Sequence, residues 1–154
     1  MDWLVLDFLS QAEHDAAAQS ILISQDEEYI EKFVSRIYEV FPKLSRKEII
    51  GQSLEARSAV IQVRNEDQAI EIINEIAPEH LQLCSEHSSS YLDKIVNAGA
   101  IFCGIYASES FGDYLAGPSH VLPTFGSARF SSPLGVYDFV KKSSGIEISK
   151  AGAN

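Results

Sequence analysis

The stretch that decides the fold is residues 58–84, with the sequence SAVIQVRNEDQAIEIINEIAPEHLQLC. Its first part, residues 58–63, is a short apolar run of the length expected for a buried strand. Residues 65–76 then place apolar side chains at helical spacing, and a second apolar run follows at 81–84. A strand, a helix and a strand in this order predict a crossover connection between parallel strands.

The segments before residue 58 extend this alternation towards the N-terminus. The expected elements are a helix over residues 3–9 that ends near 11–15, a strand at 20–24, a helix from 24–28 to Pro42, and another helix after Ser45. Acidic residues at 26–28 lie where a helix dipole favours negative charge, and Pro42 cannot continue a helix. Glu48, three residues after Ser45, predicts a capping box.

The segments after residue 84 complete the pattern. Residues 90–98 have helical spacing and stop at Gly99, which suits a C-terminal cap. Residues 100–106, AIFCGIY, form the clearest buried strand of the chain. Four short strands separated by helices predict the α/β class, with a Rossmann-like, mostly parallel open sheet and helices on both faces.

A long segment rich in glycine and proline follows the last predicted strand. Residues 107–133 show no convincing period, and loops of this length inside a compact domain are usually functional. The segment also follows a strand end, where open α/β sheets bind their ligands. Beyond it we expect a helix at 136–141, an extended segment at 146–148 and a loose tail at 151–154.

Length, composition and charge restrict the class of protein. The 154 residues suffice for one domain, and 45% hydrophobic with 22% charged residues is typical of a globular protein. The net charge of −10 argues against binding nucleic acid. No apolar run is long enough to span a membrane. Cys84 and Cys103 are too few for a disulfide scaffold and are expected to be small apolar residues of the strands. A cytoplasmic protein is therefore expected.

Four short polar clusters contain most of the chemically interesting residues: 11–15, 78–80, 112–113 and 118–120. Gln11 and His14 are three residues apart, so on a helix they share one face and could meet a single ion or ligand. Spacing alone fits equally well a polar helix end that binds nothing. The fourth histidine, His87, is expected to be exposed.

The remaining clusters could supply acid–base and metal-binding groups. Glu79 and His80 lie at a helix–strand junction, where Pro78 favours a turn by moving the preceding residue out of helical geometry. An adjacent acid and base would suit water activation and proton transfer. Asp113 and His120, seven residues apart, would join a neutral oxygen donor in a set suited to zinc. Asp113 could equally be a turn residue after Gly112.

Four stretches of the chain are long and distinctive enough to indicate a protein family. They are DFLSQAEHD at 7–15, APEHL at 77–81, GDYLAGPSHVLPT at 112–124 and FSSPLGVYDF at 130–139. In their wording and order they closely resemble histidinol dehydrogenase, and the resemblance runs from about residue 2 to the end of the chain. The resemblance implies an NAD-dependent, zinc-containing, homodimeric enzyme of histidine biosynthesis, which oxidises L-histidinol through the aldehyde to L-histidine.

The resemblance also assigns roles to residues. Gln11, His14 and Asp113 match zinc ligands, Glu79 matches the acid that activates water, and His80 matches the base that handles the proton transfers. His120 matches a residue that contacts the substrate. The residues expected to bind substrate are thus Gln11, His14, Glu79, His80, Asp113 and His120. No residue is assigned to NAD.

Members of the family are nearly three times as long as this chain, which matches their later-middle portion. Residues 1–142 are then expected to be part of a catalytic α/β domain with an incomplete sheet, and 143–154 the start of a truncated C-terminal extension. The remaining zinc ligand, a histidine, and most of the NAD site would lie outside the chain. The expectation is a fragment inactive alone, with a non-catalytic folded remnant that self-associates as the alternative.

Overall fold

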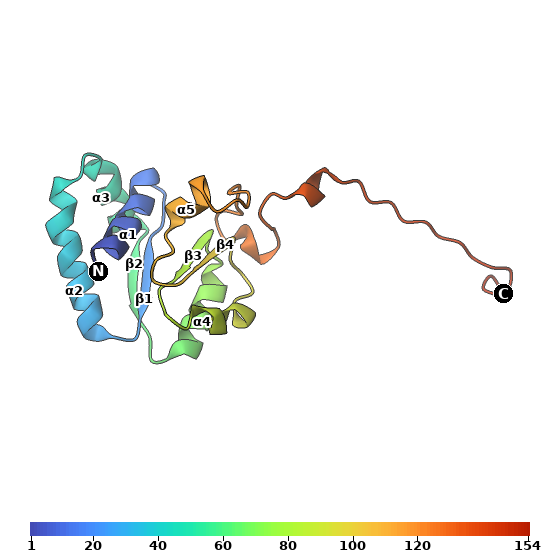
Figure 1. Cartoon of the computed structure of the whole chain (residues 1–154), viewed down its shortest axis with the longest axis horizontal. Helices are drawn as coiled ribbons and strands as arrows, with labels where there is room; N and C mark the ends of the chain where they lie inside the picture. Colours follow the sequence, from blue (N-terminus) through green and yellow to red (C-terminus); the bar gives the residue numbers. More distant parts are fainter.

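Four short strands form two separate parallel pairs, with helices around them (Figure 1). This computed structural model describes residues 1–154, apart from the side chain of Asp113. The strands are β1 (Ile21–Ser24), β2 (Ala59–Gln62), β3 (His80–Leu83) and β4 (Ala100–Cys103). The α/β class and the parallel, Rossmann-like pairing are confirmed, with the strands divided between two pairs.

The first pair carries the larger core. β1 pairs with β2 in the register Ile21↔Ala59 to Ser24↔Gln62. Around this pair lie α1 (Asp2–His14), α2 (Glu27–Val40) and α3 (Lys47–Ala56), and Figure 1 shows α2 and α3 on the side away from β3 and β4. The fully buried apolar side chains of these helices form one cluster: Val5, Leu9, Ala12, Phe33 and Ile50. Burial of this apolar surface is the main stabilising term of the domain.

The ends of α2 and α3 show which local signals decide a boundary. The Asp26 carboxylate caps α2 by accepting a hydrogen bond from the Tyr29 amide at 3.0 Å, as favoured at a helix N-terminus. A 3₁₀ turn, η1 (Phe41–Lys43), follows α2 and contains Pro42. The capping box predicted from Ser45 is wrong, because α3 begins at Lys47 with Arg46 at its N-cap and no side-chain cap.

The second pair joins β3 to β4 in the register His80↔Ala100 to Leu83↔Cys103. It packs with α4 (Glu66–Ile76), and its core cluster contains Ile73, Leu81 and Ile95. Ile23 of β1 packs against the same cluster, so it connects the two pairs.

The helix predicted over 90–98 is a 3₁₀ helix, η2 (Ser88–Lys94), and it ends before residue 95. The side chain of Asn74 explains the early end. It donates to the Lys94 carbonyl at 2.9 Å and accepts from the Val96 amide at 2.9 Å. These bonds satisfy backbone groups that a continued helix would have used.

β3 begins one residue before the apolar run at 81–84 that predicted it, and β4 is shorter than the run at 100–106. β4 ends at Cys103, and Gly104 follows with a φ of 99°, in the region that favours glycine. Cys103 is the last residue of β4, and Cys84 lies just beyond β3. Both cysteines are exposed, so the expectation that they fill the core is wrong.

The segment predicted as one long loop contains α5 (Glu109–Tyr114) and a 3₁₀ turn, η3 (Ser127–Arg129). The helix predicted at 136–141 is a shorter 3₁₀ turn, η4 (Val136–Phe139), and the described residues 146–148 form no strand. Beyond η4 the chain runs away from the body of the molecule (Figure 1). Across the described residues, every helix is too short or too polar to cross a membrane.

Candidate active site

Two predicted site residues, His80 and His120, are in direct contact. His80 is the first residue of β3, and His120 lies in the irregular segment after α5. Their Nε2 atoms are 2.9 Å apart, and the two rings are stacked with centroids 4.8 Å apart and planes 15° apart. Both side chains are half-buried. Because a neutral imidazole has one donor and one acceptor nitrogen, one ring donates and the other accepts.

A carboxylate that the sequence did not single out lies beside this pair. Glu109 Oε1 is 3.9 Å from His80 Nδ1, the other ring nitrogen from the one that contacts His120. One nitrogen of each histidine and one oxygen of Glu109 all lie within 4.8 Å of one another. The sequence could have indicated Glu109 by its position, because it is an acidic residue in the first turn of the helix that follows the carboxyl end of β4.

Gly112 and Phe102 lie close to the histidine pair. A Cβ atom on Gly112 would lie 2.7 Å from His120 Cε1 and Nδ1, and 2.8 Å from Phe102 Cζ. The Phe102 ring centroid is 6.2 Å from that of His80 and 6.4 Å from that of His120. Glycine at position 112 therefore allows α5 to approach His120 closely.

Glu79 reaches the same region because the backbone turns before β3. Ala77 ends α4 in the left-handed conformation, with φ 51° and ψ 62°, and is fully buried. The turn expected at Pro78 is therefore present. Backbone hydrogen bonds then fix the junction, since Gly99 N donates to the Pro78 carbonyl at 2.9 Å and Ala100 N to the Glu79 carbonyl at 2.8 Å.

Burial and two histidines shift the pKa of Glu79 in opposite directions. Burial raises the pKa of the Glu79 carboxyl, while the positive charges of His120 and His14 lower it in part. The carboxyl group is thus close enough to both imidazoles to respond to their charge. A carboxyl with a raised pKa can accept and return a proton nearer to neutral pH than an ordinary glutamate.

Two of the predicted zinc ligands belong to α1. Gln11 and His14 lie in the last turns of the helix, Gln11 half-buried and His14 exposed. The charge of His14 lowers the pKa of Glu79, so this end of α1 lies within electrostatic range of the helix–strand junction. Asp113 belongs to α5, and its side chain lies outside the described residues, so its predicted ligand role stays a prediction. His87 is exposed, as expected.

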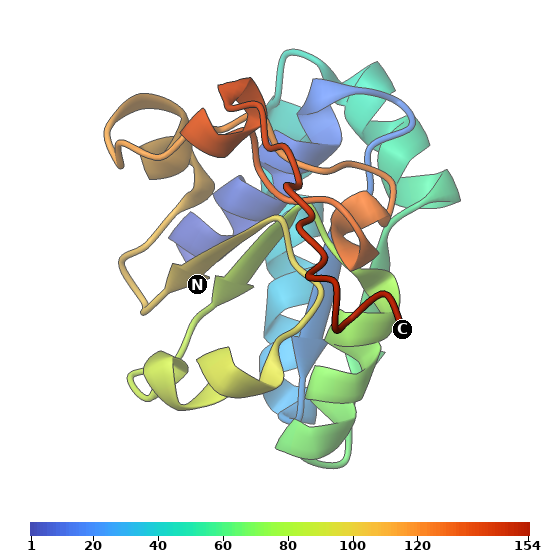
Figure 2. The ribbon, with the colours of Figure 1, turned by 90° about the vertical axis from the view of Figure 1, so that its right-hand side faces the viewer.

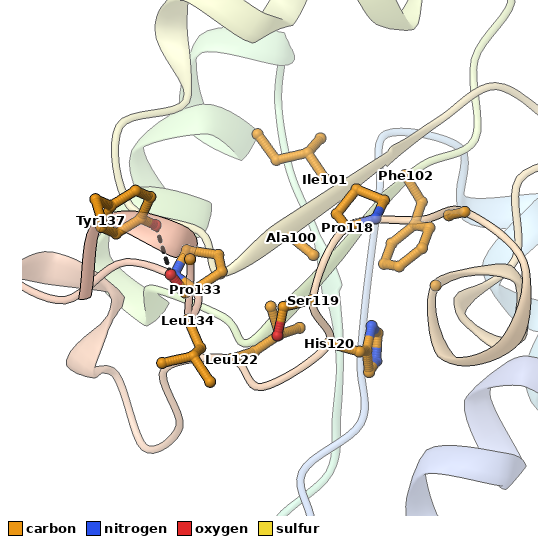
Figure 3. Close-up of a pocket in the computed structure, with 14 residues that line it drawn as sticks. Ala100, Ile101, Phe102, Pro118, Ser119, His120, Leu122, Pro133, Leu134 and Tyr137 are labelled. Atoms are coloured by element: carbon orange, nitrogen blue, oxygen red, sulfur yellow. Dashed lines mark hydrogen bonds between the residues drawn. The ribbon is translucent and has the colours of Figure 1, made fainter. Parts of the chain in front are cut away.

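A cavity of about 520 Å³ opens beside His120. In Figure 3 the His120 and Phe102 rings lie at one side of it, and Pro133, Leu134 and Tyr137 at the other. The Tyr137 hydroxyl donates to the Pro133 carbonyl at 2.6 Å, which fixes the far wall. The site thus combines an apolar cavity with an imidazole pair and carboxyl groups, which suits the binding and deprotonation of a small polar substrate.

Comparisons with known proteins identify the family. The family model described as histidinol dehydrogenase matches residues 1–154. The histidinol dehydrogenase of Ralstonia nicotianae is 55% identical over 152 residues, 99% of this chain and 34% of that protein. The enzyme of Hydrogenovibrio crunogenus is 56% identical over 153 residues, 99% of this chain and 35% of that protein.

A solved structure extends the likeness to three dimensions. The crystal structure of histidinol dehydrogenase from Elizabethkingia anophelis matches with a TM-score of 0.89 and 38% identity. The match covers 98% of this chain and 35% of that one. The chain therefore spans about a third of the length of the relatives it matches.

Proposed function

The chain belongs to the histidinol dehydrogenase family, and on this basis we propose that its residues serve the NAD-dependent oxidation of L-histidinol through the aldehyde to L-histidine. The observation that carries the proposal is the contact between His80 and His120, with Glu79 within electrostatic range. The family match supplies the reaction, and this cluster supplies acid and base groups that such a reaction needs.

His80 acts as the general base of both oxidations in this proposal. Its Nε2 lies 2.9 Å from His120 Nε2, so a proton taken from the substrate hydroxyl has an adjacent imidazole to share it. Glu109, 3.9 Å from His80 Nδ1, favours the protonated ring that results. His120 also borders the cavity, where it can contact the substrate.

Glu79 prepares water for the aldehyde step. Burial raises the pKa of its carboxyl group, which makes the carboxylate a stronger base than an exposed glutamate. The carboxylate takes a proton from water as the oxygen adds to the aldehyde carbon, and this proton then passes to the former carbonyl oxygen, which completes a diol. The resulting diol then has a hydroxyl group from which His80 removes the second proton.

Gln11, His14 and Asp113 are the proposed zinc ligands. An amide oxygen, an imidazole nitrogen and a carboxylate oxygen form a donor set that suits zinc. Gln11 and His14 lie in the last turns of α1, and the electrostatic effect of His14 on Glu79 supports a place for this helix end near the candidate site. Bound zinc would supply a Lewis acid that orients the substrate. We assign no residue of this chain to NAD.

The test is histidinol-dependent reduction of NAD⁺ with these residues in a full-length histidinol dehydrogenase, together with saturable binding of zinc and histidinol measured by calorimetry on the chain itself. His80→Ala is expected to lower turnover by about 10²–10⁴-fold, the usual contribution of a general base. His87→Ala is the matched control, because His87 is exposed and is not part of the His80–His120 pair. Unchanged turnover in His80→Ala would contradict the role of His80. Absence of saturable binding by the wild type would favour a folded protein without catalysis.

We propose further that the protein acts in the cytoplasm as a homodimer. Many large apolar side chains of the C-terminal half are exposed, which is typical of a surface covered by a partner. Among them are Tyr106, Tyr114, Leu115, Phe125, Phe130, Val136, Phe139 and Ile146. Light scattering after size exclusion is the measurement, and a monomer at micromolar concentration would contradict the proposal.

A further inference from the structure

One amide side chain, Gln82, connects three segments that carry proposed site residues. Its Nε2 donates to Asp7 Oδ2 of α1 at 3.0 Å and to the Ala107 carbonyl, just before α5, at 2.5 Å. Gln82 lies two residues after His80 on β3, so both side chains point to the same face of the strand. The side chain is half-buried, where hydrogen bonds count for more than they do in water.

The bond to Asp7 holds one face of α1. Asp7, Gln11 and His14 are spaced by four and three residues, so they share that face. The anchor at Asp7 lies about one helical turn before Gln11. A shift of α1 along or about its axis at Asp7 would therefore carry Gln11 and His14 with it.

The bond to Ala107 holds the approach to α5. Ala107 is two residues before Glu109, whose carboxylate lies near His80, and five before Gly112, which packs against His120. The backbone bond of this segment is long, since the Ala107 amide donates to the Gly104 carbonyl at 3.3 Å. In Figure 2, β3 and β4 lie in front of α1, so Gln82 spans from the strand to the helix behind it.

We propose that Gln82 is a positioning residue, which sets α1 and the start of α5 against β3 and so brings the proposed zinc ligands into register with His80. The proposal rests on the function given above. An amide is required because its NH₂ group has two donors, and both meet acceptors here. A glutamate at this position would turn a carboxylate towards the Asp7 carboxylate and the Ala107 carbonyl, where both contacts become repulsive.

The experiment measures the affinity of the chain for Co²⁺ and Zn²⁺ alone, by cobalt absorption and by competition with a chromophoric chelator. Gln82→Glu is expected to weaken both affinities about tenfold, at the low end of losses seen when a group supporting the ligands is changed. Asp7→Asn alone is expected to change little, because its amide oxygen still accepts from Gln82. Gln62→Glu is the matched control, an exposed position on β2.

The double variant separates positioning from a general loss of stability. When Gln82→Glu is combined with Asp7→Asn, the new amide on α1 can donate to the new carboxylate on β3, so the link between the two elements returns. Affinity for metal is expected to recover by several-fold relative to Gln82→Glu. Additive effects of the two substitutions, or no weakening in Gln82→Glu, would overturn the proposal.

Amide hydrogen exchange provides a reading that does not depend on metal. Gln82→Glu is expected to speed exchange of the Leu115 and Ala116 amides, which bond to the Phe111 carbonyl in α5, and to leave the β1–β2 amides unchanged. If the wild type binds no metal, the proposed function fails, while exchange still decides the role of Gln82. Equal exchange in wild type and Gln82→Glu would overturn that role on its own.

Discussion

Gly112→Ala tests whether the close approach of α5 fixes the histidine pair. The added Cβ would lie 2.7 Å from His120 Cε1 and Nδ1. Ordinary contact between such atoms begins near 3.4 Å, so the ring must move by about 0.7 Å. If it moves away from His80, the 2.9 Å contact between the two Nε2 atoms lengthens to about 3.6 Å, and the hydrogen bond is lost.

The expected change in stability is small, because two effects oppose each other. Forcing an extra methyl group into a filled space costs about 1–3 kcal/mol, whereas replacing glycine by alanine in a helix gains about 0.5–1 kcal/mol. The net loss is then about 0–2.5 kcal/mol. By contrast, a displacement of about 1 Å at a reacting group can lower turnover about 10²-fold. The variant is therefore expected to disturb the histidine pair out of proportion to its effect on stability.

Urea unfolding and the ¹⁵N spectra of the imidazoles measure the two effects separately. Gly51→Ala is the matched control, since it lies inside α3 with only Phe41 Cζ near its new Cβ, at 3.6 Å. That control is expected to gain about 0.5–1 kcal/mol. The reasoning is refuted if Gly112→Ala is stabilised like the control and leaves the signals of His80 and His120 unchanged.

Two further substitutions test the electrostatics and the core. Because burial raises the pKa of Glu79, folding favours its protonated form, and the stability from this group is complete below about pH 4.3 and is lost as the pH rises through the folded-state pKa. Glu79→Gln should therefore unfold at higher urea than the wild type at pH 7 and at about the same concentration at pH 3.5; a lower midpoint at pH 7 would contradict this. Phe33→Ala should cost about 3–5 kcal/mol in chemical unfolding, because Phe33 is fully buried in an edge-to-face contact with Phe8. The same change at Tyr38, which is 74% exposed, should cost less than about 0.5 kcal/mol, and equal losses would place the core elsewhere.

The sequence predicts elements well where one local signal dominates. The acidic cluster at 24–28 predicted a start that contains the observed N-cap Asp26, and Pro42 predicted an end close to the observed one at Val40, because capping and proline chemistry act within a few residues. The prediction of a helix over residues 90–98 was wrong for the opposite reason. Its end depends on Asn74, about twenty residues earlier in the chain, whose side chain bonds to Lys94 and Val96. No local pattern contains that contact.

The candidate site was predicted by residue type better than by arrangement. The motifs at 77–81 and 112–124 identify His80 and His120, yet nothing in their spacing indicates that the two rings stack. Glu109 was missed because it lies outside every cluster of polar residues, in a stretch assigned to a loop. Its role depends on α5 forming there and turning its first residue towards His80, which is a tertiary effect.

α1 explains why stability and chemistry are only partly separable in this protein. Its buried residues Val5, Leu9 and Ala12 are spaced by four and three, and face the larger core. The set Asp7, Gln11 and His14 has the same spacing but is offset by two residues, about 200° around the helix, so it faces β3. A substitution on the first face should therefore lower both stability and metal affinity, because it moves the whole helix. A substitution on the second face should change metal affinity while the core stays packed. Measuring both the free energy of unfolding and the metal affinity of each α1 variant distinguishes these two patterns.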